Sequence, residues 1–234
     1  MDKVSLQKRK DTKYLVPISA LEEFLKAITH SHRILRINEA LVQNYKTFYY
    51  DTPMHEMYIA HHNKKGNRYK IRVREYIESH LFFLEIKNKS NKGKTSKKRL
   101  KLNSLSIENS KKTKEFIDTN SPFCKEDILP VLGNTFSRIT LVDNDLSERI
   151  TIDQNLEAWV LDSDKRIHLP HIAIIELKQD MYAKSNTHQK LRDLRIFPTG
   201  FSKYAIASSL LFAEKLKNNN FKKKQRVIQK VVLD

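Results

Sequence analysis

Polar and apolar residues alternate along several segments of this chain, a pattern that predicts half-buried β-strands. In one predicted strand Lys70, Arg72 and Arg74 share a face, while Ile71 and Val73 share the opposite face. Other predicted strands repeat this arrangement, with ionised faces formed by Arg9, Asp11 and Lys13, by Glu85 and Lys87, by Arg149 and Asp153, and by Glu176 and Lys178. Each of these strands therefore has one apolar and one charged face.

The periodicity and the turn residues predict strands at 6–16, 45–51, 56–62, 67–78, 80–88, 97–102, 135–142, 147–153, 156–161 and 171–179. Helices are expected at 19–28, as two short segments within 105–132, at 186–195 and at 199–216. This order favours an α+β fold around a curved or closed antiparallel sheet. We expect one domain over residues 1–217, followed by a basic, mobile C-terminal tail at 218–234.

Two interpretations of the charged strand faces are open. A sheet packed on one side and wet on the other is the ordinary antiparallel case. If the sheet closes into a barrel, however, the charged faces can point inward and form a cationic channel that holds a few carboxylates. Such a channel suits phosphate, because Arg and Lys donors converge on phosphate oxygens. The carboxylates would suit a divalent metal that bridges phosphates, although Glu85 could instead neutralise Lys87 or Arg72 across strands.

Composition narrows the function further. The chain of 234 residues carries a net charge of +17, which implies a polyanionic partner. Residues 86–101 and 215–234 hold most of this excess. The four glycines do not have the spacing of a nucleotide-binding loop, and one cysteine excludes a disulfide framework. No apolar run is long enough for a membrane helix, so a soluble, cytoplasmic protein is expected.

An ordered set of short motifs resembles the triphosphate tunnel metalloenzymes, and most closely their VTC-type polyphosphate polymerase branch. The matching segments are RKDTKY (9–14), FYYDTP (48–53), YKIRVRE (69–75), FLEIKNK (83–89), SKKR (96–99), FSRITL (136–141), ERITID (148–153), IIELK (174–178) and FSKYAIA (201–207). The resemblance implies an antiparallel β-barrel tunnel with helices packed outside. It departs from the family at Asp11, where relatives often carry glutamate, and at Phe136, where some have tyrosine.

Residue roles follow from the resemblance and from the alternation. The expected catalytic residues are Lys13, Arg72, Arg74, Lys87, Arg138, Arg149 and Lys203. Substrate binding is expected from Arg9, Lys70 and Lys178 on the charged faces, from Lys98 or Arg99 after the polar loop, and from Ser202. The expected metal ligands are Glu176, which matches the family's metal-binding glutamate, and Glu85. Ser202 and Lys203 also make sense locally, because a helix N-terminus beside a lysine is an anion site.

The predicted function is a polyphosphate polymerase, which transfers the γ-phosphoryl group of ATP to phosphate or to a growing polyphosphate with the help of Mn²⁺ or Mg²⁺. A triphosphatase or nucleoside triphosphatase of the same fold is the first alternative, because the sequence does not distinguish water from phosphate as acceptor. The second is a non-enzymatic nucleic-acid-binding protein, with its basic residues on an exterior face beside stacking aromatics. Glu85 and Glu176 on the basic faces count against it, and nucleic acid is expected to bind nonspecifically if at all.

Overall fold

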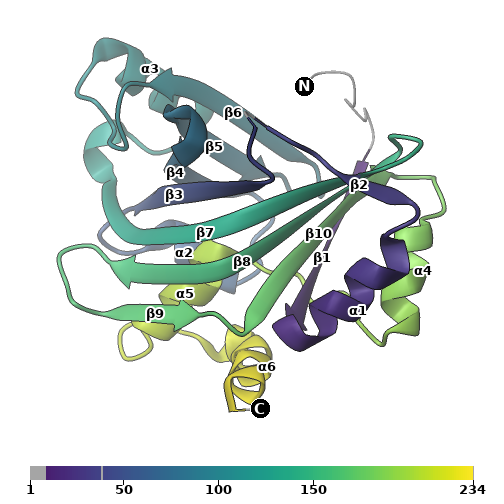
Figure 1. Cartoon of the computed structure of the whole chain (residues 1–234). Coiled ribbons are helices and arrows are strands. Elements are labelled where there is room, and N and C mark those ends of the chain that lie inside the picture. The colour runs from purple at the N-terminus through teal and green to yellow at the C-terminus, as the bar shows by residue number, and fades with distance from the viewer. Residues whose placement is uncertain (1–8, 38, 234) are drawn as a thin grey trace.

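The computed structural model describes residues 9–37 and 39–233 and consists of one large sheet with helices around it (Figure 1). The strands are β1 (Arg9–Pro17), β2 (His32–Ile34), β3 (Val42–Asp51), β4 (Arg68–Tyr76), β5 (Leu81–Lys89), β6 (Thr95–Leu102), β7 (Leu129–Asp143), β8 (Glu148–Val160), β9 (Arg166–Leu169) and β10 (Ile172–Asp180). The α-helices are α1 (Ile18–Ile28), α2 (Glu56–His62), α3 (Lys111–Asn120), α4 (Asn186–Asp193), α5 (Lys203–Leu211) and α6 (Lys222–Leu233). Short 3₁₀ turns lie at Ile77–Ser79, Lys125–Asp127 and Asn219–Phe221.

All strand pairings in the described sheet are antiparallel, and the strand order is β1-β10-β8-β7-β3-β4-β5-β6. The short strands β2 and β9 pair with β7 and β8. The sheet curves strongly and encloses a concave side, as the sequence predicts for a tunnel-like fold (Figure 1). Its closure differs from expectation: within the described residues, β1 and β6 are the two edges and do not pair with each other.

Alternation along the strands separates the apolar core into layers. On the convex side, α1 and α4 cover a cluster that includes Phe24, Ile150 and Leu177. A second convex cluster lies beneath α3, where Ile117 packs among strand residues such as Leu84. Both clusters bury the apolar faces of charged strands, so the ionised faces must turn towards the concave side.

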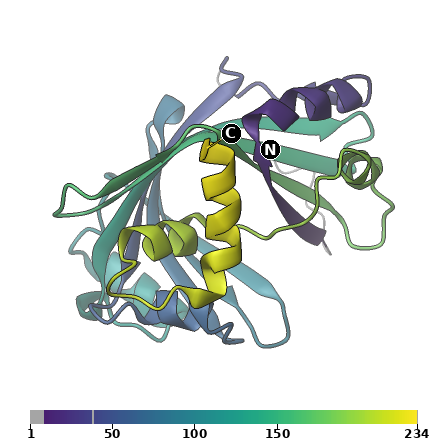
Figure 2. The same ribbon diagram turned by 90° about the horizontal axis from the view of Figure 1, so that it is seen from below.

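The concave side holds a third apolar cluster that fills part of its interior. Tyr49 and Leu132 of the sheet pack there against Tyr58 of α2 and Tyr204 of α5, and Phe221 and Ile228 join them from the C-terminal segment. Figure 2 shows α5 and α6 crossing the concavity that the sheet encloses. Helices α1, α3 and α4 thus lie outside the sheet as expected, whereas α2, α5 and α6 contribute side chains to the cluster on its concave side.

The segment 56–62 is a helix, and the strand expected there is wrong. The cause is a capping contact from the end of β3: Asp51 is fully buried, and its carboxylate accepts hydrogen bonds from the backbone N–H groups of Met57 (2.9 Å) and Tyr58 (3.0 Å). These donors belong to the first turn of α2, which has no intrahelical partners for them. A carboxylate at this place therefore selects the helix over a strand.

The C-terminal segment is also more ordered than expected. Residues 222–233 form α6 instead of a mobile tail, and Phe221 and Ile228 are only 5% and 3% exposed. These apolar side chains pack on the concave cluster, so burial offsets the helix's high lysine content. No helix among the described residues is long and apolar enough to cross a membrane.

We predict that Phe221→Ala lowers the free energy of unfolding by about 3 kcal/mol, because it removes a buried aromatic ring from the concave cluster. Chemical denaturation monitored by circular dichroism measures this change. Lys223→Ala, at an exposed position of α6, is the matched control and should stay within about 0.5 kcal/mol of the wild type. Equal stability of both variants and the wild type would mean that α6 does not dock in solution.

Candidate active site

The charged strand faces meet in a cavity of about 360 Å³ on the concave side. Its walls come from eight strands of the sheet and from the N-terminal end of α5. Ten basic side chains line it, against one lining carboxylate, Glu176. The predicted site residues that line this cavity are Lys13, Lys70, Arg72, Arg74, Lys87, Arg138, Arg149, Glu176, Lys178, Ser202 and Lys203. Strand alternation and the family resemblance together therefore placed these residues in one cationic channel.

Glu85 lies behind the cavity wall, with its side chain fully buried. Arg72, directly opposite on β4, donates from Nε to the Glu85 carboxylate at 2.7 Å, and its Nη2 lies 2.5 Å from the same oxygen. Lys97 of β6 forms an ion pair with the other oxygen. Burial alone would raise the pKa of Glu85, but Arg72, Arg74 and Lys97 outweigh it and hold that pKa well below its usual range. Because cations occupy both oxygens, this geometry fits orientation of Arg72 better than metal binding.

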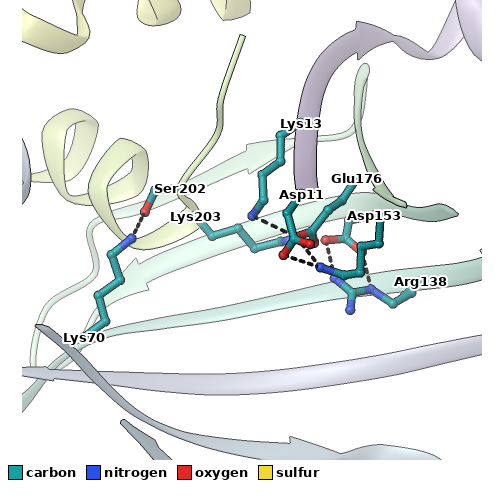
Figure 3. Close-up of polar contacts among 9 residues, drawn as sticks. Asp11, Lys13, Lys70, Arg138, Asp153, Glu176, Ser202 and Lys203 are labelled. Carbon is teal, nitrogen blue, oxygen red and sulfur yellow. Dashed lines mark hydrogen bonds and ion pairs between the residues drawn. The ribbon is translucent and has the colours of Figure 1, made fainter. Parts of the chain in front are cut away.

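A second buried carboxylate, Asp153 of β8, was not among the expected site residues. Arg138 faces it on β7 and donates to its two oxygens from Nε (2.5 Å) and Nη2 (2.8 Å). Lys203 of α5 contacts the same carboxylate (Figure 3). Burial acts to raise the pKa of Asp153, yet Arg138 and Lys203 keep it well below the ordinary value. The available sequence signal was that Asp153 shares the charged face of its strand with Arg149.

Two stacked aromatic rings support this group of cations. Tyr45 and Phe136 lie with ring centroids 4.9 Å apart, and the guanidinium groups of Arg74 and Arg138 lie 5.2–5.3 Å from the ring centroids. The Lys203 ammonium is 4.0 Å from the centre of the Phe136 ring. Phenylalanine thus lacks the tyrosine hydroxyl expected at this position but offers a cation–π surface to three basic groups.

A third group of charges lies where β1 and β10 pair. The Lys178 ammonium donates to Glu176 at 2.7 Å and to Asp11 at 2.9 Å, and the Lys13 ammonium is 3.8 Å from Glu176 (Figure 3). Burial acts to raise the pKa of Glu176, but Lys13 and Lys178 more than compensate and lower it well below the usual range. Glu176 is therefore an anion at neutral pH and an available oxygen ligand.

These residues could supply only part of the ligand set of a hexacoordinate divalent ion. No group of three or more His, Cys, Asp or Glu side chains suited to a metal occurs among the described residues. Glu176 and Asp11 nevertheless converge on one ammonium, which shows that this place holds a positive charge. Mg²⁺ commonly binds proteins through one or two carboxylates and takes its remaining ligands from water and substrate phosphates. The donor set fits a metal that arrives with a phosphate substrate.

The N-terminal end of α5 closes one side of the cavity. Ser202 caps the helix by accepting a hydrogen bond from the backbone N–H of Ala205 at 3.2 Å, and it also accepts one from Lys70 at 2.8 Å (Figure 3). Tyr204, the second residue of the helix, donates to the buried carboxylate of Asp51. Because Asp51 also caps α2, one carboxylate fixes both helices relative to β3.

Several lysines are held where their charged form is disfavoured. Burial, with Arg72 and Lys13 nearby, lowers the pKa of Lys87 to about 6. Burial likewise lowers the pKa of Lys203 to about 7, although Asp153 opposes the shift. Lys70 has a pKa well below its ordinary value because it is buried beside other cations. Parts of the channel are therefore incompletely charged near neutral pH.

The two residues expected after the polar loop, Lys98 and Arg99, lie on opposite faces of β6. Lys98 pairs with Ile86 and lies on the convex face, so its expected place in the channel is wrong. Lys97 takes that place and lines the cavity, while Arg99 shares its face but lies over the ring of Phe83, with 5.1 Å between guanidinium carbon and centroid. Alternation alone cannot fix which lysine of a consecutive run points inward. The side chain of Arg9 lies outside the described residues.

Comparison with known proteins agrees with this geometry. The sequence model of the VTC domain matches residues 8–212. No curated protein matches the chain. Among solved structures, a Hippeastrum protein described as an adenylyl cyclase candidate with a dominant triphosphatase activity superposes with a TM-score of 0.52 at 14% identity, over 85% of this chain and 94% of that one.

Two further structures are similar at a lower score. A candidate adenylate cyclase from Vibrio parahaemolyticus has a TM-score of 0.48 at 13% identity, over 86% of this chain and 98% of that one. A protein from Pyrococcus horikoshii has a TM-score of 0.47 at 15% identity, over 88% of this chain and 100% of that one. At these identities the Hippeastrum structure supports the fold and no particular activity.

We predict that triphosphate binding at pH 7 is accompanied by proton uptake. An anion beside a lysine favours the ammonium form, so binding should raise the pKa values of Lys203 and Lys87 from about 7 and about 6. Isothermal titration calorimetry in buffers of different ionisation enthalpy measures the uptake. The wild type should take up about one proton more than a Lys87→Met/Lys203→Met variant. In the wild-type complex both lysines become fully charged, whereas the variant lacks them. Equal uptake would show that both lysines are already charged in the free channel.

Proposed function

The chain belongs to the VTC domain family, and on this premise we propose that its channel transfers the γ-phosphoryl group of ATP to phosphate or to a growing polyphosphate. One observation carries the proposal: ten basic side chains and a single carboxylate line a cavity of about 360 Å³. A linear phosphate chain supplies the density of negative charge that this cavity lacks. Nucleic acid would reach the cations with difficulty, because each nucleotide brings a sugar and a base with its phosphate.

The proposed reaction requires positioning and charge stabilisation from the protein. An oxygen of the acceptor phosphate forms a bond to the γ-phosphorus of ATP, the bond from that phosphorus to the bridging oxygen breaks, and ADP leaves. The acceptor is already an anion, so no covalent protein nucleophile is needed. Arg72 and Arg138 suit the stabilising role because Glu85 and Asp153 fix the orientation of their guanidinium groups.

The other cations have separate proposed tasks. Arg74, Lys87 and Arg149 would bind phosphate oxygens along the sheet, whereas Lys13 and Lys203 would orient the reacting end of the chain. Glu176, with Asp11 at the rim, would hold Mn²⁺ or Mg²⁺ against the donor phosphates. When bound, such an ion neutralises charge that develops on the phosphoryl oxygens.

Hydrolysis of triphosphate or ATP by water is a second candidate, and the state of two lysines favours it. A water nucleophile must lose a proton, whereas an acceptor phosphate need not. Lys203 and Lys87, with pKa values of about 7 and about 6, are partly neutral amines near pH 7 and could accept that proton. The two candidates therefore predict different products from the same bound donor.

The first test is a product analysis of the purified protein with ATP and Mn²⁺ or Mg²⁺. Transfer to phosphate should yield ADP together with long polyphosphate, detected by gel electrophoresis and by digestion with a polyphosphatase. Release of stoichiometric free phosphate without polymer would support the hydrolase instead. If ATP binds and neither product forms, both candidates are contradicted.

A second test concerns the metal. Glu176→Gln should lower metal-dependent turnover by about 100-fold or more, because one charged ligand is lost. The same variant should bind triphosphate at least as tightly as the wild type without metal, because a negative charge has left an anion site. Glu157→Gln, whose carboxylate pairs with Arg166 away from the cavity, is the matched control for both measurements. Near-normal turnover of Glu176→Gln would contradict the metal role.

A further inference from the structure

A second group of cations lies beyond the end of the channel, around His61 of α2. Burial and the neighbouring Lys70, Arg68, Lys224 and Lys89 together lower the pKa of His61 to about 2, so its imidazole is neutral. Its Nδ1 atom is buried and has no hydrogen-bond partner in the part of the chain that the structure describes. We refer to Arg68, Lys89 and Lys224 around this imidazole as the outer basic cluster.

The outer basic cluster is joined to the channel through Lys70. The Lys70 ammonium contacts Ser202 at the end of the cavity, and the same lysine is among the charges that act on His61. None of the four cations around His61 forms an ion pair with a carboxylate among the described residues. This differs from the channel, where Glu85, Asp153 and Glu176 each neutralise basic groups. The outer cluster therefore has uncompensated positive charge.

Helix α6 supplies Lys224 to this cluster from outside the region that matches the family model. A Cβ atom at Gly200 would lie 3.9 Å from the Lys224 Nζ atom, so the ammonium sits against the backbone just before Phe201 and Ser202, which line the cavity. Gly200 itself has φ +59°, a conformation that glycine adopts without strain. Lys222 and Lys223 of the same helix are exposed, whereas Lys224 is half-buried. Docking of α6 thus directs one particular lysine to the end of the channel.

We propose that the outer basic cluster is a second anion subsite, which binds the distal phosphates of a linear polyphosphate whose near end occupies the channel. The inference rests on the proposed function, since it assumes that a phosphate chain fills the channel. A chain longer than triphosphate would reach both groups of cations at once, and the second contact would be intramolecular. Lys224 would then contribute to the preference for longer chains without taking part in phosphoryl transfer.

The test is a binding titration of the full-length protein, without metal and at about 0.15 M salt, with inorganic triphosphate and with a long-chain polyphosphate of defined length. The wild type should bind the long chain more tightly. Lys224→Ala should weaken long-chain binding by about tenfold, as expected for one charge-assisted contact, and should leave triphosphate binding within about twofold. Lys223→Ala, one residue away with the same loss of charge, should leave both affinities unchanged, and Lys224→Arg should retain long-chain binding.

The outcomes separate this inference from the proposed function. If the wild type does not bind triphosphate, the proposed function fails and the inference fails with it. If triphosphate binds but Lys224→Ala and Lys223→Ala weaken long-chain binding equally, the effect is general charge attraction and the inference alone is wrong. Equal loss of triphosphate and long-chain affinity in Lys224→Ala would also overturn it. So would competition by single-stranded DNA against long-chain polyphosphate at equal phosphate concentration, because that would indicate a nucleic-acid surface.

Discussion

Repulsion among inward-facing cations is the constraint on which the rest of this structure depends. A folded sheet that turns many lysines and arginines into one cavity must offset their mutual repulsion and their loss of hydration. Three carboxylates from three strands do this: Glu85 on β5, Asp153 on β8 and Glu176 on β10. Each is an anion at neutral pH because neighbouring cations lower its pKa more than burial raises it.

The position of each carboxylate also sets what its partners can do. Glu85 and Asp153 are held behind the wall, where each binds an arginine side chain in a fixed orientation. Such charge-assisted pairs limit the motion of the guanidinium group and leave its remaining donors directed at the cavity. Glu176 differs because it stays at the cavity surface and shares its charge with lysines. The structure thus separates two carboxylates that orient arginines from one that faces the cavity.

The inner face of the sheet could be predicted from the sequence because strand alternation is a strict local rule. Lys70, Arg72 and Arg74 follow it, and so do Glu176 and Lys178. The rule says which residues share a face but not which face points inward. The polar loop before β6 does not fix this choice, and the structure shows that Lys97 and not Lys98 points inward. Asp153 obeys the rule as well, yet its importance depends on Arg138 and Lys203, which meet it only in the folded chain.

Helices α2 and α6 show the other limit of local reasoning. Residues 56–62 become a helix because Asp51, at the end of β3, supplies the cap. Residues 222–233 have the composition of a solvated tail, and contacts of Phe221 and Ile228 with the concave cluster, together with hydrogen bonds from Gln225 to Ser209, hold them in place. Closure of the sheet is equally nonlocal: whether β1 meets β6 depends on the sum of curvature over all intervening strands, and in the described residues these two edges do not pair.

After these pairings the channel keeps an excess of positive charge, which affects the proposed reaction. Under the proposed function, bound phosphates would act as the missing counterions, so each added phosphate would both gain contacts and raise the charge of lysines such as Lys87 and Lys203. If the channel carries polyphosphate, a product longer by one unit that reaches the outer basic cluster is held more strongly than its precursor. Release then requires several contacts to break together, whereas another transfer requires only exchange of ADP for ATP. An excess of buried positive charge would in this way favour continued chain growth over early product release.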